Sequence, residues 1–210
     1  MISSVSLRAM ALPVAAMCVI VTAANVLIQY PFRPLGLEDY FTWGAFSYPI
    51  SFLVTDLTNR RFGPALARRV VIVGFVLAVG LSLYFASPRI ALASGTAFLV
   101  AQLLDVTVFD RLRHLAWWRA PLFSSLVGSA VDTALFFSLA FASVFSVFGP
   151  NIPFAVEQTA PFGGLMGEMP RWIGWGISDF GVKVAMGLAM LIPYGALRGL
   201  VRPLGAVRAG

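Results

Sequence analysis

Cysteine, histidine and charged residues are all scarce in this sequence of 210 residues. With 1 cysteine and 1 histidine, neither a disulfide framework nor a thiolate or histidine-rich metal site can be built. Only 11% of the residues are charged, whereas 59% are hydrophobic, which is more apolar surface than a water-soluble domain of this length can cover. The chain is therefore expected to have lipid as its solvent and to hold no metal or cofactor.

Sequence motifs of nucleotide hydrolysis and of intramembrane proteolysis are also missing. No Walker motif is present, so the chain has no evident ATPase of its own. His114 falls in a basic loop, away from any serine inside an apolar stretch. The net charge of +6 would indicate a nucleic-acid partner in a soluble chain, but here the basic residues lie in short loops between apolar runs. We expect neither enzymatic activity nor nucleic-acid binding.

Six mainly apolar stretches follow one another along the chain. A membrane-spanning helix needs about 20 such residues, and the stretches predict helices over 10–30, 41–57, 70–85, 90–109, 121–148 and 172–197. Because nothing is left for a soluble domain, residues 1–210 are predicted to form one all-α transmembrane domain. For the first stretch, a cleaved signal peptide is the alternative, although the stretch is long for one.

The basic residues are unevenly distributed between the predicted loops. Eleven arginines lie on the side of the chain termini: Arg8, Arg60, Arg61, Arg68, Arg69, Arg111, Arg113, Arg119, Arg198, Arg202 and Arg208. Only Arg33, Arg89 and Arg171 lie on the other side. Since cytoplasmic loops carry the excess of basic residues, both termini are predicted to be cytoplasmic in a multi-pass protein of the cell inner membrane.

Three ionisable residues near the middle of the last two predicted helices point to function. Each such group costs about 2.5–3.5 kcal/mol on insertion scales, so it is expected to face the bundle interior with a partner. Lys183 can pair with Asp179, one helical turn before it, or with Asp132 of the neighbouring helix at a similar depth. Either pairing leaves one carboxylate free, and we expect this spare acid to bind substrate or protons.

Other polar residues in the apolar stretches allow two interpretations each. Gln102 and Asp105 share one helix face and either fix helix packing or belong to a site. Asn25 either binds a ligand or contacts another helix. A hydroxyl stripe beside Pro49 suits close packing or a cavity wall; it comprises Ser47, Ser51, Thr55 and Thr58.

Two segments are expected to have a local structural role. Asp56 and Asn59 lie beside the basic pair that follows the second apolar stretch, so they are expected to end that helix as a cap. The long connection 149–171 is rich in glycine and proline. It is either a lid or re-entrant segment, or a simple surface connection.

Several blocks of the sequence resemble the queuosine precursor transporters of the vitamin uptake transporter family. The first is TWGAFSYPISFLVTDLTNRRFGPALARR, from Thr42 to Arg69. Further along the chain come ALASGTAFLVAQLLDVTVFDRLR, WWRAPLFSSLVGSAVDTALFFSLAF and KVAMGLAMLIPYGALR. The resemblance covers most of the chain from the second predicted helix onward.

The resemblance implies uptake of 7-cyano- or 7-aminomethyl-7-deazaguanine, through a six-helix fold like the substrate-binding subunits of energy-coupling-factor transporters. Such a base is planar and offers adjacent NH donors, so it is expected to need aromatic faces and a carboxylate acceptor. Glu168 is one further acceptor, and Trp172 and Trp175 are further faces. The expected solute contacts are Asn25, Trp43, Tyr48, Gln102, Asp132, Asp179 and Lys183.

Two other functions remain open from the sequence. One is a transporter or binding subunit for another vitamin-like solute, with or without an energising partner. The other is a non-transporting membrane scaffold factor in which the polar residues only pack helices.

Overall fold

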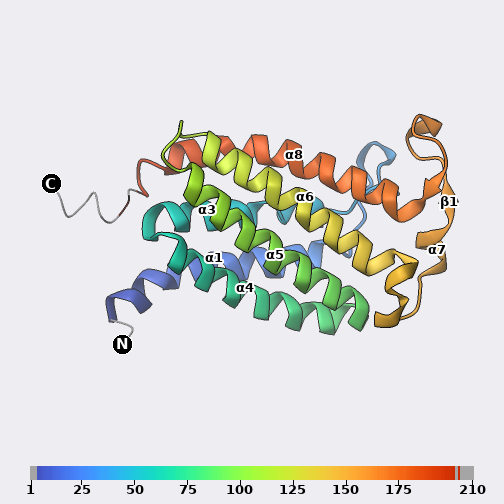
Figure 1. Ribbon diagram of the computed structural model, residues 1–210, viewed down its shortest axis with the longest axis horizontal. Coiled ribbons are helices and arrows are strands. Elements are labelled where there is room, and N and C mark those ends of the chain that lie inside the picture. The colour runs from blue at the N-terminus through green and yellow to red at the C-terminus, as the bar shows by residue number, and fades with distance from the viewer. Residues whose placement is uncertain (1–3, 202, 204–210) are drawn as a thin grey trace.

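Long helices dominate the computed structural model, which describes residues 4–201 and 203, with residues 4–9 described by their backbone alone. Within this part of the chain, five helices are long and apolar enough to cross a membrane. They lie side by side along the long axis of the molecule (Figure 1). Their bounds are α1 (Ser4–Leu27), α4 (Pro64–Phe85), α5 (Pro88–Leu112), α6 (Arg119–Phe141) and α8 (Arg171–Leu197).

The bundle has two different ends. We call the end where α8 finishes the terminal end; the turn joining α5 to α6 lies there, whereas the short turn joining α4 to α5 lies at the other end (Figure 1). At the opposite loop end, the longer connections contain only short elements. These are η1 (Pro34–Gly36), η2 (Ser143–Phe148), α7 (Pro153–Val156), β1 (Gln158–Thr159), η3 (Phe162–Gly164) and β2 (Met169–Pro170), with β1 and β2 pairing antiparallel.

The segment predicted as one helix over 41–57 is divided. A short helix, α2 (Gly44–Ser47), is followed by a turn and then by α3 (Ile50–Phe62). Pro49 lies at the break because its ring nitrogen has no hydrogen to donate. α3 continues until Gly63, whose φ of 85° is in the left-handed region. The expectation that Asp56 and Asn59 cap this helix is therefore wrong, because both are buried inside α3.

Helix boundaries also differ from the predictions where arginines lie. The helix predicted over 70–85 begins six residues earlier, at Pro64, and includes Arg68 and Arg69, which are exposed. Proline is favoured at the first helical position, and long arginine side chains can reach water from an apolar helix end. The two arginines therefore lie inside the first turns of the helix and do not mark its boundary.

Arg89 fixes the start of the long connection after α6. The helix predicted over 121–148 ends at Phe141, where Ala142 adopts an extended backbone. Arg89 is buried, with 4% of its surface exposed, and its guanidinium donates to acceptors around this break. These acceptors are the carbonyls of Leu139 at 3.0 Å, Ala142 at 2.7 Å, Gly149 at 3.1 Å and Pro150 at 3.2 Å, and the side chain of Asn151 at 3.1 Å.

Close helix packing depends on small residues at the contacts. A Cβ atom on Gly74 of α4 would lie 2.7 Å from Met17 of α1. A Cβ atom on Gly128 of α6 would lie 2.8 Å from the Phe52 ring of α3 and 3.2 Å from the Ala101 carbonyl of α5. Small residues allow membrane helices to approach in this way, and so α3 reaches the interior between the longer helices.

Replacing Arg89 by methionine is expected to loosen the connection 142–151. The change leaves several carbonyl groups without a donor, and each buried unsatisfied group costs about 1–3 kcal/mol. Hydrogen exchange in detergent should report faster exchange at residues 142–151 and a lower midpoint of thermal unfolding. Arg33→Met, which removes an exposed arginine at the same end, should change neither; equal effects of both variants would contradict this role.

Candidate functional site

A cavity of about 520 Å³ lies between the helices in the half of the bundle toward the loop end. Its volume is in the range of about 300–1,000 Å³ typical of small-molecule sites. Every long helix contributes to its wall, as do the turn after α2 and the loop-end connections. The polar lining residues include Asn25, Glu38, Asp39, Tyr48, Ser51, Ser82, Ser94, Asp132, Arg171, Asp179 and Lys183.

Lys183 forms the centre of a charged cluster at the deep end of this cavity. Its ammonium lies 2.7 Å from a carboxylate oxygen of Asp132 and also forms an ion pair with Asp179. Only 4% of the lysine side chain is exposed. Both pairings left open by the sequence therefore occur together, and one base is shared by two acids.

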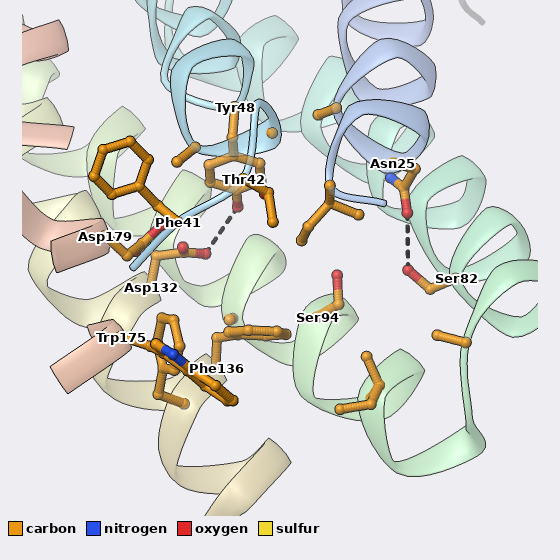
Figure 2. A pocket seen from close by; sticks show the side chains of 18 of the residues that line it. Asn25, Phe41, Thr42, Tyr48, Ser82, Ser94, Asp132, Phe136, Trp175 and Asp179 are labelled. Atoms are coloured by element: carbon orange, nitrogen blue, oxygen red, sulfur yellow. Dashed lines mark hydrogen bonds between the residues drawn. The ribbon is translucent and has the colours of Figure 1, made fainter. Parts of the chain in front are cut away.

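Hydroxyl groups complete the cluster. Lys183 donates to the Thr133 hydroxyl at 3.1 Å, and Thr133 donates to Oδ2 of Asp179 at 2.7 Å. The Tyr48 hydroxyl donates to Oδ1 of Asp132 at 2.8 Å (Figure 2), and the ammonium lies 5.3 Å from the centre of the Tyr48 ring. The lysine thus has three oxygen acceptors for its three protons.

Asp179 is the acid with an oxygen left for a ligand. Both oxygens of Asp132 accept hydrogen bonds, one from Tyr48 and one from Lys183. Oδ2 of Asp179 accepts from Thr133, whereas no donor within residues 10–201, whose side chains the structure describes, reaches its Oδ1. The Asp179 side chain is 15% exposed and that of Asp132 is 7% exposed. With two acids around one base, the cluster has one carboxyl group more than it has cations, and Asp179 presents a free acceptor to the cavity.

Aromatic rings form the wall next to the two carboxylates. Figure 2 shows Phe136 and Trp175 on one side of Asp132 and Tyr48 on the other. Trp175 packs edge-on against Phe141, with ring centres 5.6 Å apart. A planar ligand could stack against such faces while donating to a carboxylate.

Two loop-end connections meet above the cavity. Trp175 donates from its ring nitrogen to the carbonyl of Asp39 at 2.8 Å. Tyr40 stacks on Phe162 with ring centres 5.4 Å apart. The connection 149–171 therefore joins the segment before α2 at the mouth of the cavity, and its Phe154 contributes to the lining.

A separate polar group lies on the α1 side of the cavity. The Ser82 hydroxyl donates to Oδ1 of Asn25 at 3.0 Å (Figure 2), and the amide of Asn25 donates to the Val21 carbonyl at 3.0 Å. Asn25 thus links α1 to α4 and also lines the cavity.

Five of the seven expected solute contacts line the cavity, namely Asn25, Tyr48, Asp132, Asp179 and Lys183. The other two lie elsewhere. Gln102 is fully buried, accepting from Thr55 at 2.6 Å and donating to Ser51 at 2.7 Å, so its amide joins α5 to α3 behind the cavity wall. Trp43 is 42% exposed and packs against Phe32. Glu168 is exposed outside the lining.

Sequence reasoning missed Thr133, Phe136 and Phe137 as parts of the site. Phe136 follows Asp132 by four residues and Phe137 follows Thr133 by four, so each ring lies one helical turn from a polar member of the cluster. A helical-wheel projection of the sequence around Asp132 would have placed both phenylalanine rings beside the polar cluster. Thr133 carried no such signal.

Comparison with known proteins gives consistent results. Residues 42–87 and 81–197 match a family described as "Putative vitamin uptake transporter". The chain is 41% identical over 143 residues to the "Queuosine precursor transporter" of Escherichia coli, which covers 58% of this chain and 64% of that protein. It is 33% identical over 214 residues to the "Probable queuosine precursor transporter" of Haemophilus influenzae, covering 87% and 83% respectively.

A third relative is more distant. It is the "Probable queuosine precursor transporter" of Bacillus subtilis, 28% identical over 151 residues, with 58% of this chain and 65% of that protein covered. The matched region thus spans slightly less than two thirds of the Escherichia coli and Bacillus subtilis proteins. No solved structure matches the chain.

Replacing Lys183 by methionine is expected to destabilise the bundle by about 3–5 kcal/mol, because two buried carboxylates lose the cation that they share. The double variant Lys183→Met with Asp132→Asn should be more stable than Lys183→Met alone, since it removes one of the uncompensated charges. Unfolding in detergent, followed for both single variants and the double variant, measures this coupling. Strictly additive losses would contradict the shared ion pair.

Proposed function

The chain belongs to the vitamin uptake transporter family, and on that premise we propose that it imports queuosine precursors, 7-cyano- or 7-aminomethyl-7-deazaguanine, across a cell inner membrane. The names of its relatives support the solute class. The observation that carries the proposal is the free carboxylate oxygen of Asp179 beside an aromatic wall. A transporter of this family is not an enzyme, and its cavity holds the solute without reacting with it.

The chemistry of a deazaguanine matches the cavity in two ways. Its ring NH and its exocyclic amine point in the same direction, and a carboxylate can accept from both. The free Oδ1 of Asp179 would accept from these neighbouring donors, while Thr133 and Lys183 hold Oδ2. The flat ring would then lie against Phe136 and Trp175, where burial and stacking both favour it.

The cluster has a further property suited to transport. Because Lys183 is already engaged by both acids, a solute does not have to displace its ion pairs in order to bind. A site that is organised before the solute arrives loses little free energy to ordering. Release then requires only the loss of the solute's own contacts.

We propose that the chain forms one domain with six crossings, with α2 and α3 together forming the sixth. α3 alone has 13 residues, too few for a full crossing, but α2, the turn at Pro49 and α3 together extend from the loop end to the terminal end. Broken helices of this kind are common where a membrane protein binds its substrate near mid-depth.

The proposed orientation has both termini in the cytoplasm. Most arginines lie at or near the helix ends on the terminal end, for example Arg60, Arg61 and Arg113, and such an excess is typical of the cytoplasmic side. Arg202 and Arg208 lie outside the described residues, and so does the side chain of Arg8. In this orientation the cavity faces the outside of the inner membrane, on the side from which a precursor arrives.

The test uses a bacterial strain that cannot make queuosine precursors and lacks its own importer. Expression of this chain should restore queuosine in tRNA when 7-aminomethyl-7-deazaguanine is supplied at low concentration, as measured by gel retardation of tRNA on a boronate matrix. Asp179→Asn should lower uptake at limiting solute by at least about tenfold, because loss of a charged acceptor costs about 1.5–3 kcal/mol.

Glu168→Gln provides the control, since it removes an exposed acid outside the cavity lining. It should restore queuosine as well as the unchanged chain does. Absence of queuosine despite normal amounts of the chain in the membrane would reject the solute. Full activity of Asp179→Asn would reject the assigned contact.

A further inference from the structure

A second pair of acids is buried between the charged cluster and the terminal end. Asp56 of α3 is 2% exposed and Asp105 of α5 is 0% exposed. Their carboxyl groups lie within hydrogen-bonding reach of each other, and the Ser124 hydroxyl of α6 donates to Asp56 at 3.3 Å. Two carboxylates in such contact cannot both be ionised without a compensating cation.

No basic side chain in the described chain forms a salt bridge with either acid. On α8, Lys183 shares a small cavity with Asp56, but its ammonium is engaged by the other two acids. Arg60 on α3 donates instead to the carbonyl of Arg198 at 3.4 Å. Tyr194 of α8 also lines the small cavity. The arginines of α4, Arg68 and Arg69, are exposed. Residues 10–27 of α1 include no charged residue.

Near this pair, the buried side-chain atoms without a hydrogen-bond partner are all acceptors. Both oxygens of Asp105 are buried and receive no hydrogen bond, and neither does Oδ1 of Asn59. The Asn59 amide is held against α5 because its nitrogen donates to the Val106 carbonyl at 2.9 Å. An unsatisfied buried acceptor costs about 1–3 kcal/mol, and a charged one costs more. The acid pair and Asn59 together therefore lack a hydrogen-bond donor or a cation.

A proton fits this place better than a metal ion does. The cavity beside Asp56 has a volume of about 10 Å³, which is at most the space of one water molecule. A sodium ion would need several oxygen ligands around it, whereas a proton shared by two carboxyl groups needs no space. A proton on Asp56 would also supply a donor to an unpartnered oxygen of Asp105.

We propose that Asp56 and Asp105 together bind one transported proton, and that this proton couples solute import to the proton gradient. This inference rests on the proposed import of a deazapurine base. The proton enters from water in the large cavity and passes along the small cavity shared by Lys183 and Asp56. It leaves to cytoplasmic water when the terminal end opens and both carboxyl groups become solvated.

The experiment uses the full chain in liposomes with labelled 7-aminomethyl-7-deazaguanine and with the membrane potential clamped at zero. One proton per solute predicts about tenfold accumulation for a gradient of one pH unit, acid outside, since one unit corresponds to a tenfold change in equilibrium. A pH dye inside the vesicles should report acidification on addition of solute. Asp105→Asn replaces the shared proton by an amide donor, so it should still exchange internal for external solute but lose the accumulation.

The matched control is Asp110→Asn on the same helix, because Asp110 is 39% exposed and pairs only with Arg113. It should accumulate solute as the unchanged chain does. Exchange without gradient-driven accumulation in the unchanged chain would overturn the proton site and leave the import function standing. Accumulation driven by a sodium gradient alone would also overturn the proton site and leave the import function standing. Accumulation by Asp105→Asn would have the same consequence. Absence of exchange under every condition would overturn the import function, and the proton site with it.

Discussion

A lysine ammonium at mid-depth in a membrane bundle is stable only when nearby acids compensate its charge. Lys183 meets this condition by contacting Asp132 on α6 and Asp179 on its own helix. Thr133 and Tyr48 orient the two carboxylates, and Tyr48 brings in the segment at the break between α2 and α3. Three parts of the chain are thereby fixed around one cation, and the cavity forms beside them.

The two halves of the bundle differ in how they are filled. Toward the loop end, the helices leave about 520 Å³ of open space. Toward the terminal end, small residues such as Gly128 allow α3, α5 and α6 to close on one another. Together with our proposed orientation, this describes a carrier open to the outside and closed to the cytoplasm. The proposed proton site lies in the closed half, where its release requires the same opening that frees the solute.

Much of the architecture was predictable because it depends on composition and on charge. Long apolar stretches indicate helices without further information, and the rarity of buried charge drew attention to Asp132, Asp179 and Lys183. Their mutual contacts were only partly predictable. Depth along a helix can be estimated from sequence, but the rotation of a helix about its axis is set by packing, and rotation decides which acids reach the lysine.

The remaining differences have local physical causes. Gln102 looked like a ligand for solute, but Ser51 and Thr55 satisfy its amide behind the wall. Arg89 looked like a loop charge, whereas it is buried and binds the carbonyls around the end of α6. Asp56 and Asn59 looked like a helix cap, but α3 continues to Gly63 and buries both side chains. For Gln102 and Arg89 the tertiary partners lie far away in sequence.

The most direct measurement is a structure of the chain with 7-aminomethyl-7-deazaguanine bound. The account predicts density for the base in the large cavity, its ring NH and amine facing Asp179, its plane against Phe136 and Trp175, and the ion pairs of Lys183 intact. A base bound elsewhere, or one that takes Lys183 away from both acids, would contradict it.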